Sequence, residues 1–351
     1  MSGRFDARNA LLVLCAVLAI VLSTEISLVP AARVAAAAGP KIRVTVLMSN
    51  AGDPYFANKS YGYQEYANED PGVELQFLNA GGYDKLEVQV QQIEDAIQRG
   101  TDVLLVTPVD AKGVCPAVGE AIKKGIVVVA DDTGIECNFK VPLFVTENSH
   151  QMGFEQCKFL AERIGGKGGI VALWGAAGPA HIRRRQQGCL DALKQFPGVK
   201  LLAGEYGGHG VEDGLRLTED FITRFGHNIK AIYSAGSVIA DGASRALKAA
   251  GYKPGQIPLV GIDMTEQSIK LMNDGWFQGI QAAQPVRVAY LVTKYGVALK
   301  RGQKIPGGAG VFSCCQLVLL TTDYMVVTPE IFKTFPTDLA LAPAGWAPPI
   351  K

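Results

Sequence analysis

The sequence has little net charge and no familiar catalytic motif. It carries 34 Lys and Arg residues against 33 Asp and Glu residues, for a formal net charge of +1, so no electrostatic argument favours nucleic acid as a partner. It lacks H-E-x-x-H, G-x-S-x-G and P-loop motifs, and no G-x-G-x-x-G follows a strand-like run. Its four histidines lack the spacing of metal ligands. We therefore expect no catalysis, no cofactor and no metal, and look for function in local groups of binding residues.

Long apolar runs are absent after the first 39 residues. Residues 1–39 read as a secretory signal, with Arg4 and Arg8 as a basic start, an apolar stretch over 10–22 and a small-residue cleavage region over 34–38. The apolar stretch is short for a membrane span, although a retained anchor is the alternative. We expect cleavage, export and a soluble mature protein.

The rest of the chain alternates short β-branched runs with helical patterns. The strand-like runs are 42–48, 73–78, 103–106, 126–130, 170–174, 200–203, 231–234 and 259–262. Such alternation predicts βαβ units, and nearly all-apolar strands predict parallel sheets covered by helices on both faces. The roughly 310 residues after the signal exceed one usual core, so we expect two domains.

The runs form two similar sets of about 110 residues each. They predict an α/β protein with two doubly wound parallel-sheet lobes joined by a multi-strand hinge. We place 41–147 plus 285–312 in the first lobe and 148–284 plus 313–325 in the second. Residues 326–351, which contain five prolines, are predicted to be an extended tail on a lobe surface.

Six cysteines remain if Cys15 leaves with the signal, and an oxidising compartment permits them to form disulfides. Cys115 and Cys137 follow successive strands of one lobe and are the expected pair. Cys157 and Cys189 are either bonded or buried free thiols. The neighbours Cys314 and Cys315 are not expected to bridge each other.

Polar and aromatic residues follow several of the predicted strands. Asp53-Pro54-Tyr55-Phe56 follows the run 42–48, and two later strands end in Asp131-Asp132 and Asp263. Ligands of open α/β sheets bind at the carboxyl ends of strands. Aromatic faces stack on the C–H faces of sugars and polyols, carboxylates accept from their hydroxyls, and Arg185 is a suitable donor. The alternatives are core positions for the two rings, a helix cap for Asp132 and a solvated Arg185.

From residue 41 to about 325 the chain resembles type I periplasmic solute-binding proteins of the ribose-binding-like group. The resemblance rests on Asp53-Pro54-Tyr55-Phe56, on residues 125–132, on Arg183-x-Arg185-x-x-Gly188, on residues 260–263 and on Gln284-Pro285. It implies a periplasmic receptor that closes on a small polar ligand and passes it to an ABC permease. It also implies ligand-binding roles for Asp53, Tyr55, Phe56, Asp131, Asp132, Arg185, Asp263 and Gln284.

Three positions depart from that group's pattern. Asp132 stands where arginine is commoner, and Gly236-Ser237 replaces a frequent Asn-Asp pair, leaving Ser237 as the candidate there. His209 falls near a position often held by an aromatic residue and could act as a ring or a donor.

A more local likeness points to a different partner. Tyr61-Gly62-x-Gln64-Glu65, residues 79–83 and Gln151-Met152-Gly153 resemble the periplasmic receptor of the trimethylamine-N-oxide sensory system. That resemblance implies a membrane histidine kinase in place of a permease, with Tyr55, Phe56 and Tyr83 as a cage for a methylated amine. Three acidic candidates favour a hydroxylated ligand and hence transport.

We therefore predict a monomeric periplasmic solute-binding protein for a sugar, polyol or derivative, serving an ABC importer, with the sensor as the alternative. An acid–base enzyme using Asp131 and Asp132 is a weaker hypothesis, because adjacent residues at a strand end point apart. A DNA-binding repressor of similar fold would carry an N-terminal helix-turn-helix, and this chain begins with an export signal.

Overall fold

The computed structural model describes residues 40–306, 315–321, 326–334, 338 and 341–343. The predicted signal over 1–39 lies outside these residues, and Lys41 onward forms one compact unit. Within the described ranges, no helix has the length and apolar character needed to cross a bilayer.

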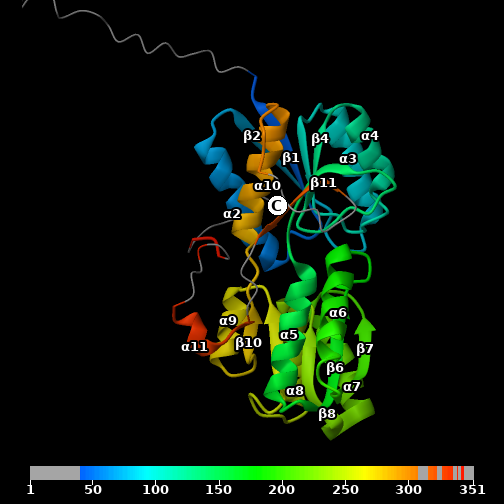
Figure 1. Ribbon diagram of the computed structural model, residues 1–351, viewed down its shortest axis with the longest axis vertical. Coiled ribbons are helices and arrows are strands. Elements are labelled where there is room, and N and C mark those ends of the chain that lie inside the picture. The colour runs from blue at the N-terminus through cyan, green and yellow to red at the C-terminus, as the bar shows by residue number, and fades with distance from the viewer. Residues whose placement is uncertain (1–39, 307–314, 322–325, 335–337, 339–340, 344–351) are drawn as a thin grey trace, which may run out of the picture. The chain divides into compact units, whose positions relative to one another are not determined.

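The first lobe is a six-stranded parallel sheet with helices on both faces (Figure 1). The strand order is β11-β5-β4-β3-β1-β2, which contains the 2-1-3-4-5 order of one doubly wound class. Its elements are β1 (Ile42–Met48), α2 (Pro54–Glu69), β2 (Val73–Asn79), α3 (Leu86–Gln98), β3 (Val103–Val106), α4 (Cys115–Lys123), β4 (Val127–Asp131), β5 (Val141–Glu147), α10 (Pro285–Lys300) and β11 (Cys315–Thr321).

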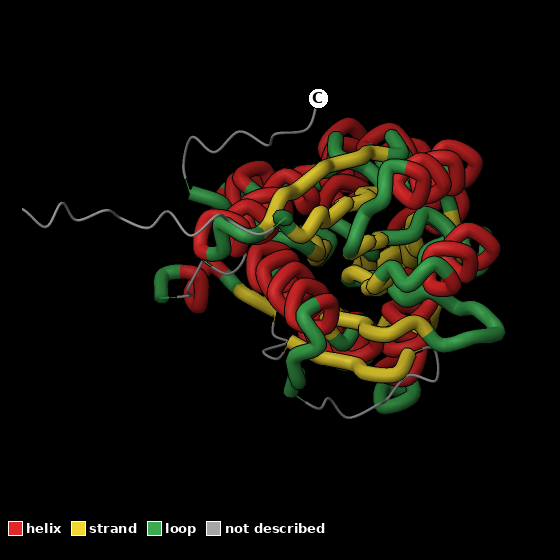
Figure 2. The backbone as a smooth tube through the Cα atoms, turned by 90° about the horizontal axis from the view of Figure 1, so that it is seen from above, coloured by secondary structure: helices red, strands yellow, loops and turns green. Residues whose placement is uncertain are grey.

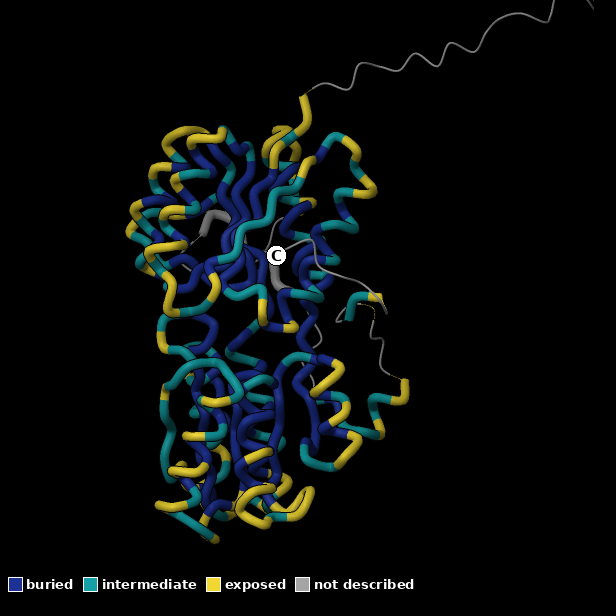
Figure 3. The backbone as a smooth tube through the Cα atoms, turned by 180° about the vertical axis from the view of Figure 1, so that it is seen from behind, coloured by how far each residue is buried: buried dark blue, intermediate teal, exposed yellow. Residues whose placement is uncertain are grey.

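Alternate residues of β1 and β3 belong to two hydrophobic cores. Val44 and Val46 of β1 pack in the core that contains residues of α2 and α10, whereas Leu47 joins the core under α3 and α4. Successive side chains of a strand point to opposite faces. A sheet covered on both faces therefore requires nearly continuous apolar strands, and Figure 3 shows the central strands of the sheet in dark blue, as buried.

The second lobe repeats this architecture, with strand order β12-β10-β9-β8-β6-β7. Its residues form two hydrophobic cores, and the view from above shows helices on either side of strands in the molecule (Figure 2). The strands pair in parallel except β12, which is antiparallel to β10. Its elements are α5 (Ser149–Arg163), β6 (Lys167–Gly175), α6 (Ala180–Leu193), β7 (Gly198–Tyr206), α7 (Val211–Phe225), η1 (Gly226–Asn228), β8 (Ile229–Ser234), α8 (Ser237–Ala249), β9 (Leu259–Ile262), α9 (Glu266–Asn273), β10 (Gly279–Gln281), β12 (Val326–Val327) and α11 (Pro329–Phe332).

Three elements differ from the sequence-based expectations. The segment 313–325 was expected in the second lobe, but its described part, β11, pairs with β5 in the first. The tail from 326 is not purely extended, because β12 joins the second sheet and α11 follows it. Strand β5 was missed: it contains Pro142, and proline inside a run argues against a strand. Pro142 is paired with a residue of neither β4 nor β11, so its missing N–H removes no hydrogen bond from the sheet.

The described residues contain two disulfides, one in each lobe. Cys115–Cys137 is the predicted pair and is confirmed, with the two Cα atoms 5.5 Å apart. Cys157 and Cys189 are also bonded, joining α5 to α6, so the bonded alternative holds for these two residues. Cys314 lies outside the described residues.

Candidate functional site

A small cavity lies where the carboxyl ends of strands from both lobes meet. Its free volume is about 20 Å³, room for about one water molecule. The first lobe contributes Asp53, Tyr55, Phe56, Tyr83, Thr107 and Asp132, and the second contributes His181, Arg185, His209 and Asp263. Most of the residues predicted for the site therefore come together, although they span more than two hundred positions of the chain.

Asp132 and Asp263 occupy equivalent places in the two lobes. Each directly follows the fourth strand of its lobe, β4 or β9. They are also the two non-glycine residues with positive φ in the described chain, at 65° and 79°. The left-handed conformation is costly for most residues but is tolerated by aspartate. The two halves of the sequence repeat therefore share this backbone conformation at the cavity wall.

Hydroxyl groups hold the backbone of both aspartates. Thr146 donates to the carbonyl of Asp132, and Ser237 and Ser268 donate to the carbonyl of Asp263 at 2.8 and 2.9 Å. These bonds accompany the strained conformation at each position. Ser237 does not line the cavity, so its place in the structure is that of a support for Asp263.

Asp131 does not line the cavity, although the sequence interpretation made it a ligand-binding residue. Its side chain is turned into the first lobe, where Lys59 Nζ lies 2.7 Å from Oδ1 and the Tyr63 hydroxyl donates to Oδ2. The side chains of Asp131 and Lys59 are fully buried. Asp131 is the last residue of β4, and a shift of one residue along a strand reverses the face to which a side chain points. The equivalent of Asp263 is therefore Asp132.

Aromatic rings form the wall contributed by the first lobe. Tyr55 and Phe56 begin α2, with ring centroids 5.5 Å apart and planes nearly perpendicular. Asp53 caps this helix by accepting from the Tyr55 amide at 2.9 Å, as aspartate at an N-cap commonly does. The Tyr55 hydroxyl is buried without a hydrogen-bond partner in the described structure. Both rings belong to the core as well as to the cavity, so the two readings from sequence hold together.

Arg185 is the cationic side chain in the cavity wall. Its Nη1 donates to the Ala235 carbonyl at 3.0 Å, while its Nε is buried without a partner among the described residues. Glycine sets its position: a Cβ at Gly153 of α5 would lie 1.9 Å from the Arg185 carbonyl oxygen. The two helices can therefore approach closely only with glycine there. Arg185 is 5% exposed, so the solvated alternative is wrong.

The other arginines of the run 183–185 contact the opposite lobe. Arg183 Nη2 lies 2.6 Å from Glu136 Oε2, and Arg184 lies 3.5 Å from the same carboxylate. His181 adds a third contact, its Nδ1 lying 2.9 Å from Thr133 Oγ1. The lobes thus touch along the edge of the cavity.

His209 fills space that a side chain at 236 would otherwise occupy. A Cβ at Gly236 would lie 2.4 Å from His209 Nε2, so the glycine in Gly236-Ser237 is required by the histidine. The His209 ring lies 5.5 Å from that of Tyr83, centroid to centroid, and its Nδ1 is buried without a partner among the described residues. Thr107 and His181 also line the cavity but were not expected from the sequence, and Tyr83 was expected only for the methylated-amine alternative. Tyr83 and Thr107 lie just after strands, a position that could have indicated them.

Gln284 lies at the hinge and not in the cavity wall. Its backbone amide donates to Glu147, which ends β5 and precedes the first crossing between lobes. The other oxygen of Glu147, Oε2, is buried and has no partner in the described structure. The bond therefore ties two crossings together directly behind the cavity.

Burial shifts the acids and the histidines in opposite directions. It raises the pKa of Asp53 to about 6 and the pKa of Asp263 to about 7. Burial, with the nearby Asp132, raises the pKa of Glu147 to about 8. Burial and the Arg185 charge lower the pKa of His209 to about 4 and that of His181 well below its ordinary value. Both imidazoles are therefore neutral at pH 7.

A wider cleft leads outward from the cavity and shares Asp53, Tyr83 and His209 with it. Its volume is about 720 Å³. The rest of its lining is rich in glycine and includes Asp84 and Asp213 but neither lysine nor arginine. In the residues that the structure describes, no three His, Cys, Asp or Glu side chains gather as a metal site.

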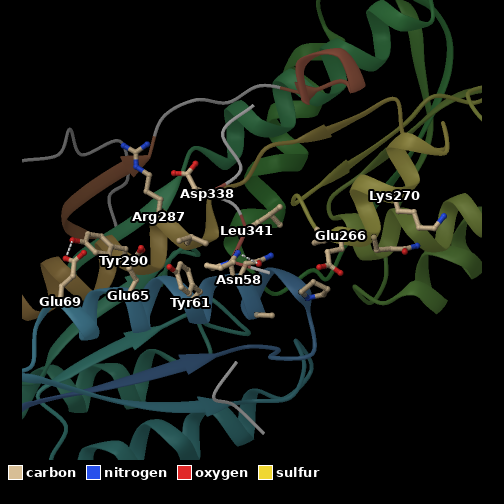
Figure 4. Close-up of a pocket in the computed structure, with 17 residues that line it drawn as sticks. Asn58, Tyr61, Glu65, Glu69, Glu266, Lys270, Arg287, Tyr290, Asp338 and Leu341 are labelled. Carbon is tan, nitrogen blue, oxygen red and sulfur yellow. Dashed lines mark hydrogen bonds between the residues drawn. The ribbon is translucent and has the colours of Figure 1, made fainter. Parts of the chain in front are cut away.

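A larger groove, separate from this cavity, lies between α2, α9 and α10 (Figure 4). It is bordered by Tyr61, Glu65 and Tyr290 of the first lobe and by Glu266 and Lys270 of the second. Part of the tail lies along it. The Ala342 amide donates to Asn58 Oδ1 at 2.9 Å, while Leu341 packs against a core of the second lobe. The described part of the tail thus touches both lobes.

Two doubly wound lobes that meet over a small polar cavity define the type I periplasmic binding protein fold. A sequence profile of the family described as periplasmic binding protein domain matches residues 44–304. The chain belongs to this family. The predicted fold class and family are confirmed, whereas the likeness to the trimethylamine-N-oxide receptor stays a prediction.

Several relatives are named for small hydroxylated ligands. The chain is 29% identical to the xylitol-binding protein of Mycolicibacterium smegmatis over 218 residues, which are 62% of this chain and 61% of that protein. It is 27% identical to the ribose import binding protein of Haemophilus influenzae over 272 residues, 78% of this chain and 90% of that protein. A solved periplasmic solute-binding protein of an ABC transporter from Actinobacillus succinogenes, with bound D-allose, superposes with a TM-score of 0.74 at 25% identity, covering 84% of this chain and 100% of that one.

Proposed function

We propose that this protein is a periplasmic solute receptor that binds a small sugar, polyol or derivative between its lobes and delivers it to an ABC importer. The observation that carries the proposal is the cavity itself, where aromatic faces, carboxylates and one guanidinium converge from both lobes. The relatives named for xylitol and ribose and the neighbour with bound D-allose support a hydroxylated ligand.

Each cavity residue has a role that its chemistry supports. Tyr55 and Phe56 stack on C–H faces of the ligand, and Tyr83 closes the same side. Asp53, Asp132 and Asp263 accept from hydroxyl groups, while Arg185 donates. His209 presents its unpartnered ring nitrogen, Nδ1, as a neutral donor or acceptor.

Binding draws the lobes together and produces a shape that a membrane partner reads. The contacts between the run 181–184 and the loop 133–136 are the latch of this closed form. The protein acts as a monomer and performs no covalent chemistry in this scheme.

A thermal-shift screen of sugars, polyols, sugar acids and methylated amines tests the proposal. A ligand at about 100 times its Kd should add about 2.7 kcal/mol of stability. Calorimetry on the Asp263→Ala variant then tests the site, and unchanged affinity would remove the second-lobe carboxylate from it. Uniformly flat melting curves for every hydroxylated compound would contradict the proposal.

The alternative partner is a membrane sensor kinase, to which the closed receptor would present its bound state. The rings of Tyr55, Phe56 and Tyr83 favour this alternative, because aromatic faces attract a methylated amine. A thermal shift with trimethylamine-N-oxide but with no hydroxylated compound would select this alternative.

A further inference from the structure

The cavity and its surroundings hold more carboxyl groups than cationic groups. Asp53, Asp132 and Asp263 line it, against the single guanidinium of Arg185. Glu147 stands close enough to raise the pKa of Tyr55 and to be influenced by Asp132. The lining histidines are neutral at pH 7, because their pKa values are lowered. A neutral ligand would leave this imbalance buried.

The nearby lysine does not correct the imbalance. Lys59 lies behind the aromatic wall, with Nζ 5.7 Å from the Phe56 ring centroid and 5.8 Å from that of Tyr55. Its charge is already matched by Asp131 at 2.7 Å. A paired buried charge offers little to a third group. The three cavity aspartates, by contrast, form no ion pair with any described residue.

The excess charge is divided between the lobes. Asp53 and Asp132 belong to the first lobe, Asp263 belongs to the second, and Glu147 lies at the hinge. Closing an empty cavity therefore brings carboxyl groups together in a place poorly screened by water, where burial raises the pKa values of Asp53, Glu147 and Asp263 and disfavours their charged forms. A ligand that supplies positive charge would offset this penalty, and so would favour closure beyond the contacts it makes.

The cavity also contains polar groups prepared for a hydroxylated ligand. Arg185 Nε, the Tyr55 hydroxyl and His209 Nδ1 are buried and have no hydrogen-bond partner in the described structure. All three residues line the cavity. A buried polar group that makes no hydrogen bond costs folding free energy. The ligand therefore needs hydroxyl groups as well as a cation.

We infer, on the basis of the proposed function, that the ligand is an amino-substituted polyol or sugar. Its ammonium group lies among Asp53, Asp132 and Asp263. Its hydroxyl groups contact Arg185, Tyr55 and His209. The rings of Tyr55, Phe56 and Tyr83 stand beside the same carboxylates and favour a cation through their faces. Sugar acids and sugar phosphates are excluded by the same charges.

Matched pairs of compounds test this inference by isothermal titration calorimetry on the mature protein at pH 7. The probes are D-glucitol, ribitol and myo-inositol, each beside the compound in which one hydroxyl is an amine, together with D-gluconate. We expect the amine to bind at least 10-fold more tightly than the alcohol in the best pair, and gluconate not to bind. Titration in buffers of different ionisation enthalpy should show proton release with the amine, because the cation drives buried carboxyls to ionise.

Asp132→Asn separates the charge from the shape. Asparagine keeps the size and tolerates the left-handed conformation of this position, so the variant should fold with an unchanged melting temperature. Its preference for the amine should fall toward that for the alcohol. Asp95→Asn on α3 is the control: it makes the same charge change in the same lobe outside the cavity, and should leave the preference intact.

The possible results separate this inference from the proposed function. Equal or tighter binding of the neutral compound in every pair that binds would overturn the amino-ligand inference and leave the receptor function standing. Failure of every polyol and amino-polyol to bind, together with flat melting curves for every sugar in the thermal-shift screen, would overturn both. Tighter binding of choline or trimethylamine-N-oxide than of any amino-polyol would overturn the hydroxylated class.

Discussion

The two lobes share a backbone plan but contribute different chemistry to the cavity. Both place an aspartate in the left-handed conformation after the fourth strand, at Asp132 and Asp263. Around that common point the first lobe adds aromatic faces, whereas the second adds Arg185 and two imidazoles. The fold therefore repeats the position of a ligand acceptor, and the neighbouring residues decide what each side recognises.

A second difference lies beneath the cavity wall. The first lobe has a fully buried ion pair between Lys59 and Asp131 under its aromatic rings. At the matching strand end of the second lobe stands Ile262, a fully buried apolar residue. One lobe thus has a charge pair at this strand end, and the other has an apolar side chain that belongs to the same core as Tyr55 and Phe56.

Breaking the buried ion pair of the first lobe should have the largest effect on stability. Lys59→Met leaves the Asp131 carboxylate buried without its partner, which we expect to cost about 3–5 kcal/mol of unfolding free energy. Urea unfolding measures this loss. The double variant Lys59→Met with Asp131→Leu should recover most of it, and failure of that recovery would show that the pair's geometry matters more than its charge.

Substituting Asp131 and Asp132 one at a time should distinguish structural support of the cavity wall from ligand binding. Asp132→Asn is expected to weaken ligand affinity by about 10-fold, roughly 1.4 kcal/mol, with little change in stability. Asp131→Asn should do the reverse, lowering the melting temperature while a residual folded fraction keeps its affinity. Calorimetry beside thermal unfolding distinguishes them. A larger affinity loss from Asp131→Asn would restore the original sequence interpretation.

The pH dependence of the ligand-free protein should expose the second-lobe carboxylate. The folded pKa of Asp263 is about 7, above the ordinary 3.8, because burial disfavours its charge. The folded state therefore keeps a proton that the unfolded chain releases, and this contribution to stability is present below about pH 4 and lost as the pH rises through 7. Asp263→Asn should stabilise the ligand-free protein by about 1 kcal/mol at pH 8 and have little effect at pH 4.

Thermal unfolding at the two pH values checks the sign of this effect. His209 acts oppositely, since its lowered pKa makes stability rise with pH between about 4 and 6.5. His209→Gln in the Asp263→Asn background removes that contribution. Destabilisation by Asp263→Asn at pH 8 would contradict a buried, unpaired charge at this position.

Removing the ion pairs between the lobes should have the smallest effect on stability. Glu136→Gln removes the partner of Arg183 and Arg184, both partly exposed, and should change stability by less than about 1 kcal/mol. Because the contact exists only when the lobes touch, ligand dissociation should become a few-fold faster. Stopped-flow measurements follow that rate. Glu120→Gln on α4, whose ion pair with Lys123 stays within one helix, is the matched control.

Much of the fold could be read from residue patterns, with informative exceptions. Apolar runs such as 42–48 and 103–106 are strands because both of their faces must be buried. Strand β5 escaped detection because Pro142 argues locally against a strand, and only its neighbours show that the ladders avoid it. The lobe of β11 likewise depends on which sheet edge its partner offers, which is not written in its own residues.

The sequence by itself determined that this chain has two similar α/β lobes and that Tyr55, Phe56, Arg185 and Asp263 are ligand-facing candidates, because periodicity, strand ends and a family resemblance are local properties. Only the tertiary structure decided between Asp131 and Asp132, since a single backbone residue in the left-handed region turns one carboxylate to the cavity and leaves the other facing Lys59. The excess of negative charge in the cavity was equally hidden, because it depends on which charged groups the fold pairs and which it leaves facing the ligand.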